Sequence, residues 1–322
     1  MQTRLTEILN IEHPVMLAGM GGVSYNELVI AVSEAGGFGC LGASTMGTEM
    51  MVEEIDLVRK GTDKPFGVDL LTAMPGDMTG QVEKIIAGGA SLFVAGLGVP
   101  REVIELCHKH SVKVANMCGK VEHALRAVEA GCDIVVAQGT EAGGHTGLVA
   151  TLPLVPQIVD AVGDKVPVVA AGGIFDGRGL LAALSLGADG IWVGTRFIAT
   201  PEARAVMGYK DRLVEVREDQ TAISRGYSGK TMRVLKNSYT EYWEQHSDEL
   251  QKFPNQAVRS IQDGVFHLGG DESMEGIDPS RECYPAGQGA GAIHEIIPAK
   301  ELVLKFIEEA KSAFEKVNQQ IK

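Results

Sequence analysis

The sequence lacks the paired cysteines that build a disulfide framework or a metal site. No two of its cysteines form a CxxC pair, and their number is odd, which favours free thiols in a reducing compartment. The HxH pair His108 and His110 lies in a polar helix end, where a solvated terminus is the simpler interpretation, and we expect no bound metal. The five cysteines are Cys40, Cys107, Cys118, Cys132 and Cys283.

Basic runs and long apolar stretches are also missing. The chain of 322 residues carries a net charge of −13. An acidic chain without a cluster of Lys and Arg is a poor ligand for nucleic acids or anionic membranes. No apolar run is long enough to span a bilayer, and residues 1–14 lack the apolar block of a secretion signal. We therefore expect a cytoplasmic protein that binds neither nucleic acid nor membrane.

Short apolar runs alternate with amphipathic stretches along most of the chain. Each run is too short for a typical helix and is bounded by Gly or Pro, as buried parallel strands are. The amphipathic stretches carry helix signals: Ser24 is expected to be an N-cap, with Glu27 three residues later, and Gly131 and Gly187 end two other helices. The pattern favours a (β/α)8 barrel; the alternative is an open doubly wound sheet with fewer strands. The eight runs begin near positions 13, 36, 64, 91, 112, 132, 166 and 189.

Residues 200–297 break this alternation because they are rich in charged and aromatic residues. We expect a mostly helical insertion between the eighth strand and a closing helix at 299–317. The predicted division is a barrel of residues 1–215 and 296–322 and an insertion of residues 216–295 that covers its mouth as a lid. Four aromatic residues either line a substrate pocket or pack the insertion on the barrel: Tyr227, Tyr239, Tyr242 and Trp243.

Glycines gather where the predicted strands end, which in a barrel is where active sites lie. They follow the first strand and lie in residues 171–173 and 193–195, after the seventh and eighth strands. Backbone N–H groups at these last two positions usually hold a phosphate, so the positions imply a phosphate-bearing cofactor. The segment "EAGGHTG" places His145 at the same mouth, where its imidazole could exchange a proton with a substrate. The alternative is a turn with a surface histidine.

Four segments carry a family resemblance: "QGTEAGGHTG", "VPVVAAGGIFDGRGLL", "IEHPVMLAGMGG" and "YPAGQGAGAI". Together they resemble the nitronate monooxygenases, FMN-dependent TIM-barrel enzymes, over about residues 3–317. The framework is also similar to flavin-type enoyl-acyl-carrier-protein reductases, flavin NADH:quinone reductases and some acyl-CoA dehydrogenases. The resemblance implies noncovalent FMN, a small-molecule substrate, and O2 or NAD(P)H as redox partner, and it is compatible with a homodimer.

The resemblance also implies the site residues. His145 matches the catalytic histidine. Position 69 departs from the family, where Asn is common, and Asp69 could stay protonated, pair with Lys120 or face away from the cofactor. The residues matched to FMN contacts are Gly19, Met20, Gly21, Asp69, Met117, Gln138, Gly143, Gly144, Ala171, Gly172, Gly173, Gly194, Thr195 and Gln288.

We therefore expect an FMN-dependent oxidoreductase that oxidises alkyl nitronates with O2. His145 would deprotonate a nitroalkane or donate a hydrogen bond to the nitronate. The alternatives are an NAD(P)H-dependent reductase of quinones or enoyl thioesters, an acyl-CoA dehydrogenase relative, and a flavin-binding barrel without turnover.

Overall fold

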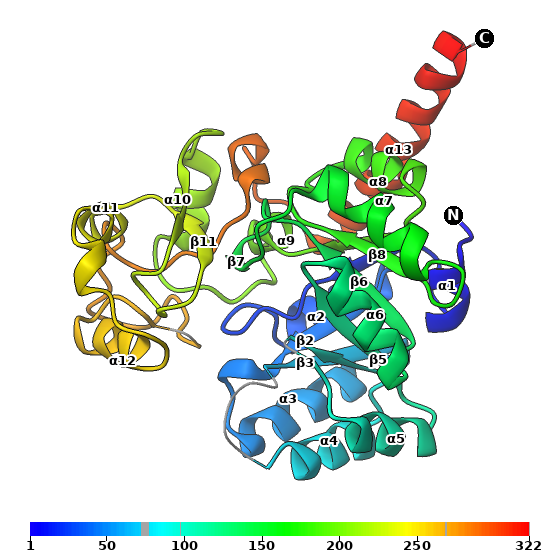
Figure 1. Ribbon diagram of the computed structural model, residues 1–322, viewed down its shortest axis with the longest axis horizontal. Helices are drawn as coiled ribbons and strands as arrows, with labels where there is room; N and C mark the ends of the chain where they lie inside the picture. The colour runs from blue at the N-terminus through cyan, green and yellow to red at the C-terminus, as the bar shows by residue number, and fades with distance from the viewer. Residues whose placement is uncertain (72–76, 97, 268, 322) are drawn as a thin grey trace.

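Eight parallel strands form the barrel of the computed structural model, which describes residues 1–71, 77–96, 98–267 and 269–321 (Figure 1). They follow the order β1-β9-β8-β6-β5-β4-β3-β2. A parallel bridge between Met16 and Phe38 closes the ring, and the Leu17 N–H donates to the Phe38 carbonyl at 2.9 Å. The predicted TIM barrel is confirmed. The strands are β1 Val15–Leu17, β2 Gly39–Gly42, β3 Phe66–Leu70, β4 Leu92–Ala95, β5 Lys113–Cys118, β6 Ile134–Gln138, β8 Val168–Ala171 and β9 Gly190–Val193.

Helices follow the strands and cover the outside of the barrel (Figure 1). The expected closing helix is present and runs four residues further than predicted, to Ile321. None of the helices in the described ranges has the length and apolar character needed to cross a membrane. The helices are α1 Arg4–Leu9, α2 Asn26–Glu34, α3 Thr48–Gly61, α4 Met78–Ala87, α5 Arg101–Lys109, α6 Val121–Ala130, α7 Thr151–Val162, α8 Gly177–Ser185 and α13 Ala299–Ile321.

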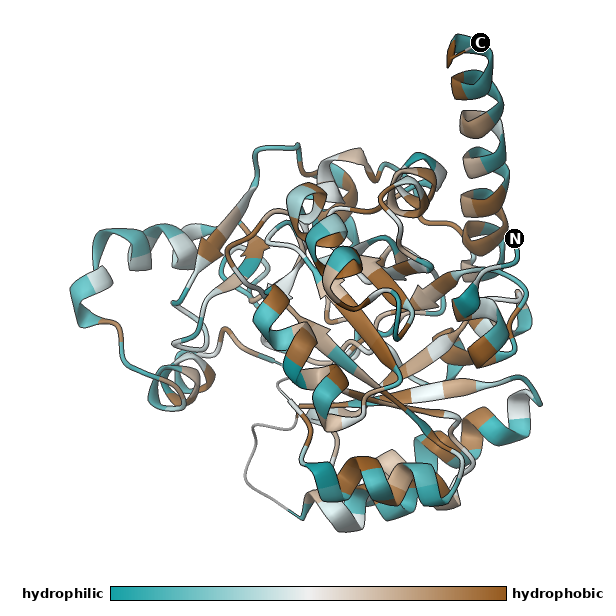
Figure 2. Cartoon of the chain, turned by 45° about the vertical axis from the view of Figure 1, so that its right-hand side comes forward, coloured by the Kyte–Doolittle hydropathy of each residue, from teal (hydrophilic) through white to brown (hydrophobic). Residues whose placement is uncertain are grey.

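The strands alternate between two hydrophobic layers because successive side chains point to opposite faces. One layer packs under the helices, and the other fills the barrel interior with residues such as Met16, Phe38 and Trp192. Apolar colour accordingly runs along the strands, while the helices are striped (Figure 2). Leu5 and Leu9 of α1 join the interior cluster. They plug the amino-terminal end, because a Cβ at Gly190, the first residue of β9, would lie 2.4 Å from Leu5. Helix α1 therefore does not cover the carboxyl end of the barrel, where we expect the active site.

The insertion after β9 holds strands as well as the expected helices. β10 and β11 form an antiparallel hairpin, and β11 pairs with the short strand β7 (Gly144–His145) of a barrel loop. Sequence analysis did not anticipate this three-stranded sheet. The elements of this region are α9 Thr195–Ile198, α10 Tyr209–Glu215, β10 Thr221–Ser224, β11 Met232–Leu235, α11 Ser238–Gln245 and α12 Asn255–Gln262, with 3-10 turns η2 Ser247–Glu249 and η3 Gln288–Ala292. A third 3-10 turn, η1 Ala43–Thr45, follows β2.

The insertion has a hydrophobic core of its own. Tyr227, Tyr239 and Trp243 are buried in one cluster, so they pack the insertion and the pocket interpretation is wrong for them. Tyr242 is 41% exposed and stacks on His246. This separate core supports our proposal that residues 216–295 form a subdomain.

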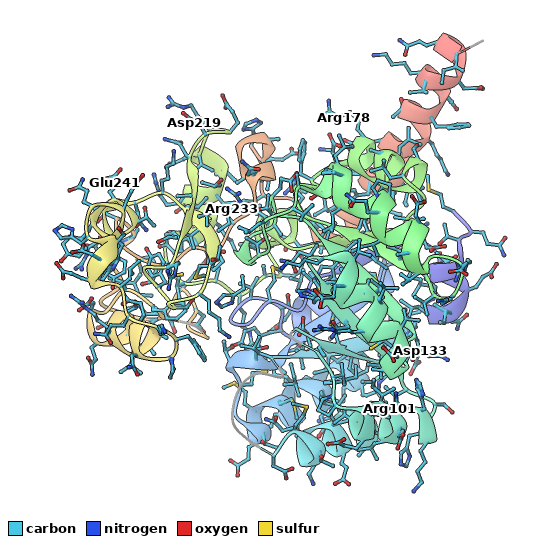
Figure 3. All side chains as sticks on the ribbon, in the orientation of Figure 1. Arg101, Asp133, Arg178, Asp219, Arg233 and Glu241 are labelled. Atoms are coloured by element: carbon cyan, nitrogen blue, oxygen red, sulfur yellow. The ribbon has the colours of Figure 1, made fainter. Side chains whose placement is uncertain are left out.

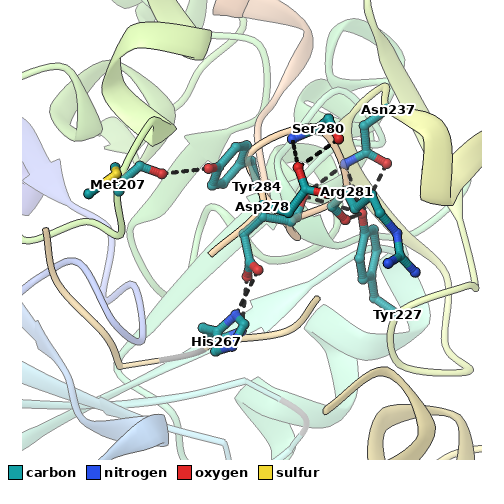
Figure 4. Close-up of polar contacts among 9 residues, drawn as sticks. Met207, Tyr227, Asn237, His267, Asp278, Ser280, Arg281 and Tyr284 are labelled. Carbon is teal, nitrogen blue, oxygen red and sulfur yellow. Dashed lines mark hydrogen bonds and ion pairs between the residues drawn. The ribbon is translucent and has the colours of Figure 1, made fainter. Parts of the chain in front are cut away.

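A polar network ties this core together (Figure 4). The Tyr227 hydroxyl donates to the carbonyls of Arg281 and Glu282 at 2.7 and 3.2 Å. The Asn237 amide also donates to the Glu282 carbonyl, at 2.8 Å, and the buried Glu282 carboxylate holds the His267 ring. The segment before η3 is thereby fixed against the β10–β11 hairpin.

One helix signal was assigned wrongly from the sequence. Helix α2 begins at Asn26 with Tyr25 as its N-cap, whose side chain makes no capping hydrogen bond; the Glu54 carboxylate instead accepts from the Asn26 N–H at 3.0 Å. Ser24 instead accepts a hydrogen bond from the Met20 N–H at 3.2 Å and donates to the Ala18 carbonyl at 2.8 Å. A serine hydroxyl binds nearby backbone groups as readily as it caps a helix, and here it shapes the loop after β1.

We predict that Gly42→Ala destabilises the barrel. A Cβ there would lie 2.2 Å from the Met20 carbonyl oxygen, so the β1 loop would have to move. Overpacking of this kind lowers the free energy of unfolding by about 1–3 kcal/mol. Gly47→Ala is the matched control, since nothing lies within 4 Å of its Cβ position, and its cost should be below about 1 kcal/mol. Urea denaturation measures both, and equal losses would contradict the close packing at Gly42.

Candidate active site

The loop after β1 meets the ends of three other strands at the carboxyl end of the barrel. A Cβ at Gly19 would lie 2.3 Å from the Cβ of Asp69 on β3, and one at Gly21 would lie 2.7 Å from Thr45, which follows β2. A Cβ at Gly194, after β9, would lie 3.1 Å from the Met20 sulfur. Any larger residue at Gly19 or Gly21 would clash, so these glycines bring the loop onto its neighbours.

The predicted phosphate-binding segments end β8 and β9. Gly172 and Gly173 have φ of +108° and +73°, a conformation that glycine adopts without strain. Gly194 caps α9, and Thr195 is the first residue of that helix. The Thr195 hydroxyl oxygen accepts a hydrogen bond from the Gly287 N–H at 2.9 Å. The backbone that follows β8 and β9 therefore lies beside residues 287–289, where η3 begins.

That segment also packs on the loop that carries the histidine. A Cβ at Gly143 would lie 2.8 Å from the backbone of Ala286 and Gly287. The Gln288 N–H donates to the Glu141 carbonyl at 2.9 Å. The Glu141 carboxylate accepts hydrogen bonds from the backbone and hydroxyl of Thr151, both at 2.8 Å. The carboxylate therefore anchors the loop to the start of α7.

His145 is held by both the barrel and the insertion. It pairs with Met232 of β11, and the Gln138 amide donates to its carbonyl at 2.8 Å. Its Nε2 lies 3.0 Å from the hydroxyl of Ser228, a buried residue of the β10–β11 turn. Desolvation by the surrounding protein and the positive charge of Lys230 lower the pKa of His145 below 6.5. The residue is exposed to solvent, and its lowered pKa favours the neutral imidazole at pH 7.

Asp69 points into the barrel mouth. On β3 the residues Phe66, Val68 and Leu70 belong to the outer layer, so Asp69 lies on the inner face, and its packing on Gly19 excludes the outward orientation. Burial raises the pKa of its carboxyl to about 8. Among the residues that the structure describes, no ion pair joins it to Lys120, so the expected pairing is not found. The side chain is a neutral acid at pH 7.

The remaining expected cofactor contacts lie at the same end of the barrel. Met20 and Met117 are partly buried and pack against the inner cluster that contains Ala171. Gly144 has φ of +73°, and nothing lies within 4 Å of its Cβ position. Met117 is connected to Met20 and Ala171 through this cluster.

Sequence reasoning missed three polar residues of the site. Thr45 has a buried hydroxyl without a hydrogen-bond partner among the described residues. Ser228 and Lys230 reach His145 from the insertion. The segment "GYSG", residues 226–229, places a hydroxyl between two glycines much as "GGHTG" places the histidine, and this signal could have found Ser228.

Known proteins of one family share this sequence and fold. The nitronate monooxygenase family model matches residues 2–88 and 73–309. A probable nitronate monooxygenase of Staphylococcus aureus (strain JH9) is 32% identical over 318 residues, which cover 84% of this chain and 89% of that protein.

Two solved structures are similar over nearly the whole chain. FabK from Thermotoga maritima aligns with a TM-score of 0.88 and 34% identity, covering 99% of each chain. Nitroalkane oxidase from Streptomyces ansochromogenes aligns with a TM-score of 0.83 and 28% identity, covering 97% of this chain and 99% of the other. The chain therefore belongs to the nitronate monooxygenase family and is an oxidoreductase.

Proposed function

We propose that this chain binds FMN noncovalently and oxidises alkyl nitronates with O2. The observation that carries the proposal is His145, a neutral imidazole held at the glycine-lined carboxyl end of the barrel. Membership of a family that is flavin-dependent in general supports the cofactor.

The residues at this end fit FMN. Backbone N–H groups of Gly172, Gly173, Gly194 and Thr195 would hold the phosphate, because the glycines and the start of α9 present donors there. The unpartnered Thr45 hydroxyl is a further donor near the β1 loop. The ring would be bordered by Gly19, Met20, Gly21, Asp69, Met117, Gln138, Gly143, Gly144, Ala171 and Gln288. FMN would supply the electron chemistry.

The protein's own contribution is to move and hold a proton. A neutral His145 accepts the proton that a nitroalkane loses when it becomes a nitronate. The Ser228 hydroxyl lies 3.3 Å from the Lys230 carbonyl and accepts from the Lys230 N–H at 3.2 Å. With its single proton donated to that carbonyl, Ser228 accepts from Nε2 of His145 and leaves Nδ1 as the basic nitrogen.

A second candidate function is NAD(P)H-dependent reduction of enoyl thioesters or quinones. It is favoured by one observation: the FabK structure is more similar to this chain than the nitroalkane oxidase structure is, in both TM-score and identity. Anaerobic mixing of the protein with NADH, NADPH and propionate 3-nitronate in turn separates the two functions. Rapid bleaching of the flavin by the nitronate alone supports nitronate oxidation, and rapid bleaching by a nicotinamide cofactor alone overturns it.

The purified protein should be yellow, with FMN that is released on denaturation. The measurement is the absorbance spectrum before and after unfolding, with the released flavin identified chromatographically. A protein that stays colourless when incubated with FMN would contradict the proposed function.

His145→Ala should keep FMN bound and lose turnover. Loss of a general base typically costs about 10²–10⁴-fold in rate, and the loss should be larger with a neutral nitroalkane than with a preformed nitronate. In the parent, oxidation of the nitroalkane should rise with pH through a pKa below 6.5 and then level off, because the neutral imidazole is the active form. Equal rates for variant and parent on both substrates would assign His145 to a surface turn.

Asp69→Asn should alter the flavin midpoint potential mainly above pH 8. Asp69 is neutral below its pKa of about 8 and becomes anionic above it, where its charge opposes the electrons added to the flavin. The parent's potential should therefore fall more steeply with pH above 8 than that of the variant. A spectroelectrochemical titration from pH 6 to 9 tests this, and identical curves would show that Asp69 does not sense the flavin.

A further inference from the structure

Positive charge gathers on the hairpin beside His145. The chain as a whole carries a net charge of −13, yet residues 220–240 contain four basic residues and no acidic one. One of the four, Arg233 of β11, is labelled in Figure 3. It is used internally, because it is buried and donates to the Thr140 carbonyl and the Thr221 hydroxyl. Of the other three, Arg225 and Lys236 are exposed and Lys230 is partly exposed.

Three basic residues adjoin Gly229, and we call Arg225, Lys230 and Lys252 the basic rim. The Arg225 Nε donates to the Gly229 carbonyl at 3.3 Å, and Lys230 is the next residue. A Cβ at Gly229 would lie 2.9 Å from the backbone of Lys252, so the segment before α12 packs on the turn. The Lys230 Nζ lies 4.3 Å from the centre of the Phe253 ring.

No carboxylate neutralises the basic rim within the part of the chain that the structure describes. None of the ion pairs found there includes Arg225, Lys230 or Lys252. Asp248 and Glu249 precede Lys252 closely in sequence but are exposed and pair with none of the three. Several positive charges on one turn, without a paired carboxylate, raise the local concentration of anions.

The basic rim borders the candidate active site. Ser228, between Arg225 and Lys230, contacts Nε2 of His145, and Lys230 is close enough to act on the charge of that ring. The Thr146 N–H donates to the Thr231 carbonyl at 3.3 Å, so the loop of His145 continues along the same turn. Arg233 lies beside Gly144, and its charge faces Glu141 of the barrel loop. An anion on the rim would therefore lie at the edge of the mouth.

We propose that Arg225, Lys230 and Lys252 bind the phosphate groups of a nucleotide-bearing second substrate and so direct its reactive end toward His145. The shared chemistry is the adenosine diphosphate half of nicotinamide dinucleotides and coenzyme A thioesters. This goes beyond nitronate oxidation, because an alkyl nitronate and O2 carry no phosphate, and it deepens the second candidate function, on which it rests, by assigning residues to the nucleotide.

Isothermal titration of the FMN-loaded protein with ADP tests the site without turnover. Single substitutions Arg225→Gln, Lys230→Gln and Lys252→Gln should each weaken ADP binding about tenfold, as expected for a charge-assisted hydrogen bond worth about 1.5 kcal/mol. Affinity should also fall with added salt. Lys230→Arg, which keeps the charge, should bind within about threefold of the parent.

Lys236→Gln is the matched control. Lys236 lies on the same hairpin and is exposed, but it follows the far end of β11, away from His145. The control should bind ADP as the parent does. The flavin spectrum and thermal unfolding of each variant report whether it is folded and loaded.

Steady-state kinetics then identify the source of the phosphates. If the second substrate is a nicotinamide dinucleotide, Arg225→Gln and Lys252→Gln should raise KM for NADH or NADPH while kcat changes little; Lys230→Gln is left out of this comparison because its charge also acts on His145. If it is a coenzyme A thioester, the same two variants should raise KM for that thioester but not for the pantetheine thioester that lacks the nucleotide.

Three results would overturn the site: ADP binding weaker than about 1 mM in the parent, unchanged affinity in all three rim variants, or an equal loss in Lys236→Gln. Each of these binding results can occur whether or not the protein oxidises nitronates. Nitronate oxidation is measured separately, as oxygen uptake with propionate 3-nitronate. Failure of the rim and failure of the proposed function are therefore distinguishable.

Discussion

The pairing of β7 with β11 is the constraint on which the site depends. It joins two residues of a barrel loop, Gly144 and His145, to a hairpin that begins about 75 positions later in the chain. Arg233 strengthens the junction by donating to the Thr140 carbonyl from a buried position. Without this pairing the histidine would lie on a glycine-rich loop with few contacts, and its ring would have no fixed orientation.

Burial sets the charge of the site as much as its shape. Asp69 and His145 have opposite chemistry, yet desolvation acts on both and favours the neutral form of each at pH 7. The mouth of a strongly acidic protein thus holds a neutral acid and a neutral base. Under the function that we propose, such an uncharged site would suit either a neutral nitroalkane or its anion. The positive charges beside it lie on the insertion.

The barrel was predictable because its signals are local. Each strand is a short apolar run, and Gly131 and Gly187 end helices with the positive φ that glycine tolerates. Position at the carboxyl ends of strands also placed His145 and the glycines after β8 and β9 at one end of the barrel; that these glycines bind phosphate stays a prediction. Ser24 was misassigned because a serine hydroxyl can cap the following helix or bind the preceding loop. The sequence does not show that the Met20 N–H and the Ala18 carbonyl are within its reach. The hairpin and Ser228 were missed because their pairing depends on distant residues, and Tyr227 and Trp243 pack a separate core that no periodic pattern announced.

The shared strand pairing limits how this enzyme can change its specificity. A substrate-selecting lid that is independent of the catalytic group can be exchanged as a module, and the chemistry persists. Here the hairpin that pairs with β7 also supplies the hydroxyl beside Nε2 of His145 and the cation that lowers the pKa of this imidazole. If His145 is the proton acceptor that we propose, any exchange of residues 221–235 would also alter its surroundings, so new substrates would be reached more readily through the barrel loops or through positions beyond β11.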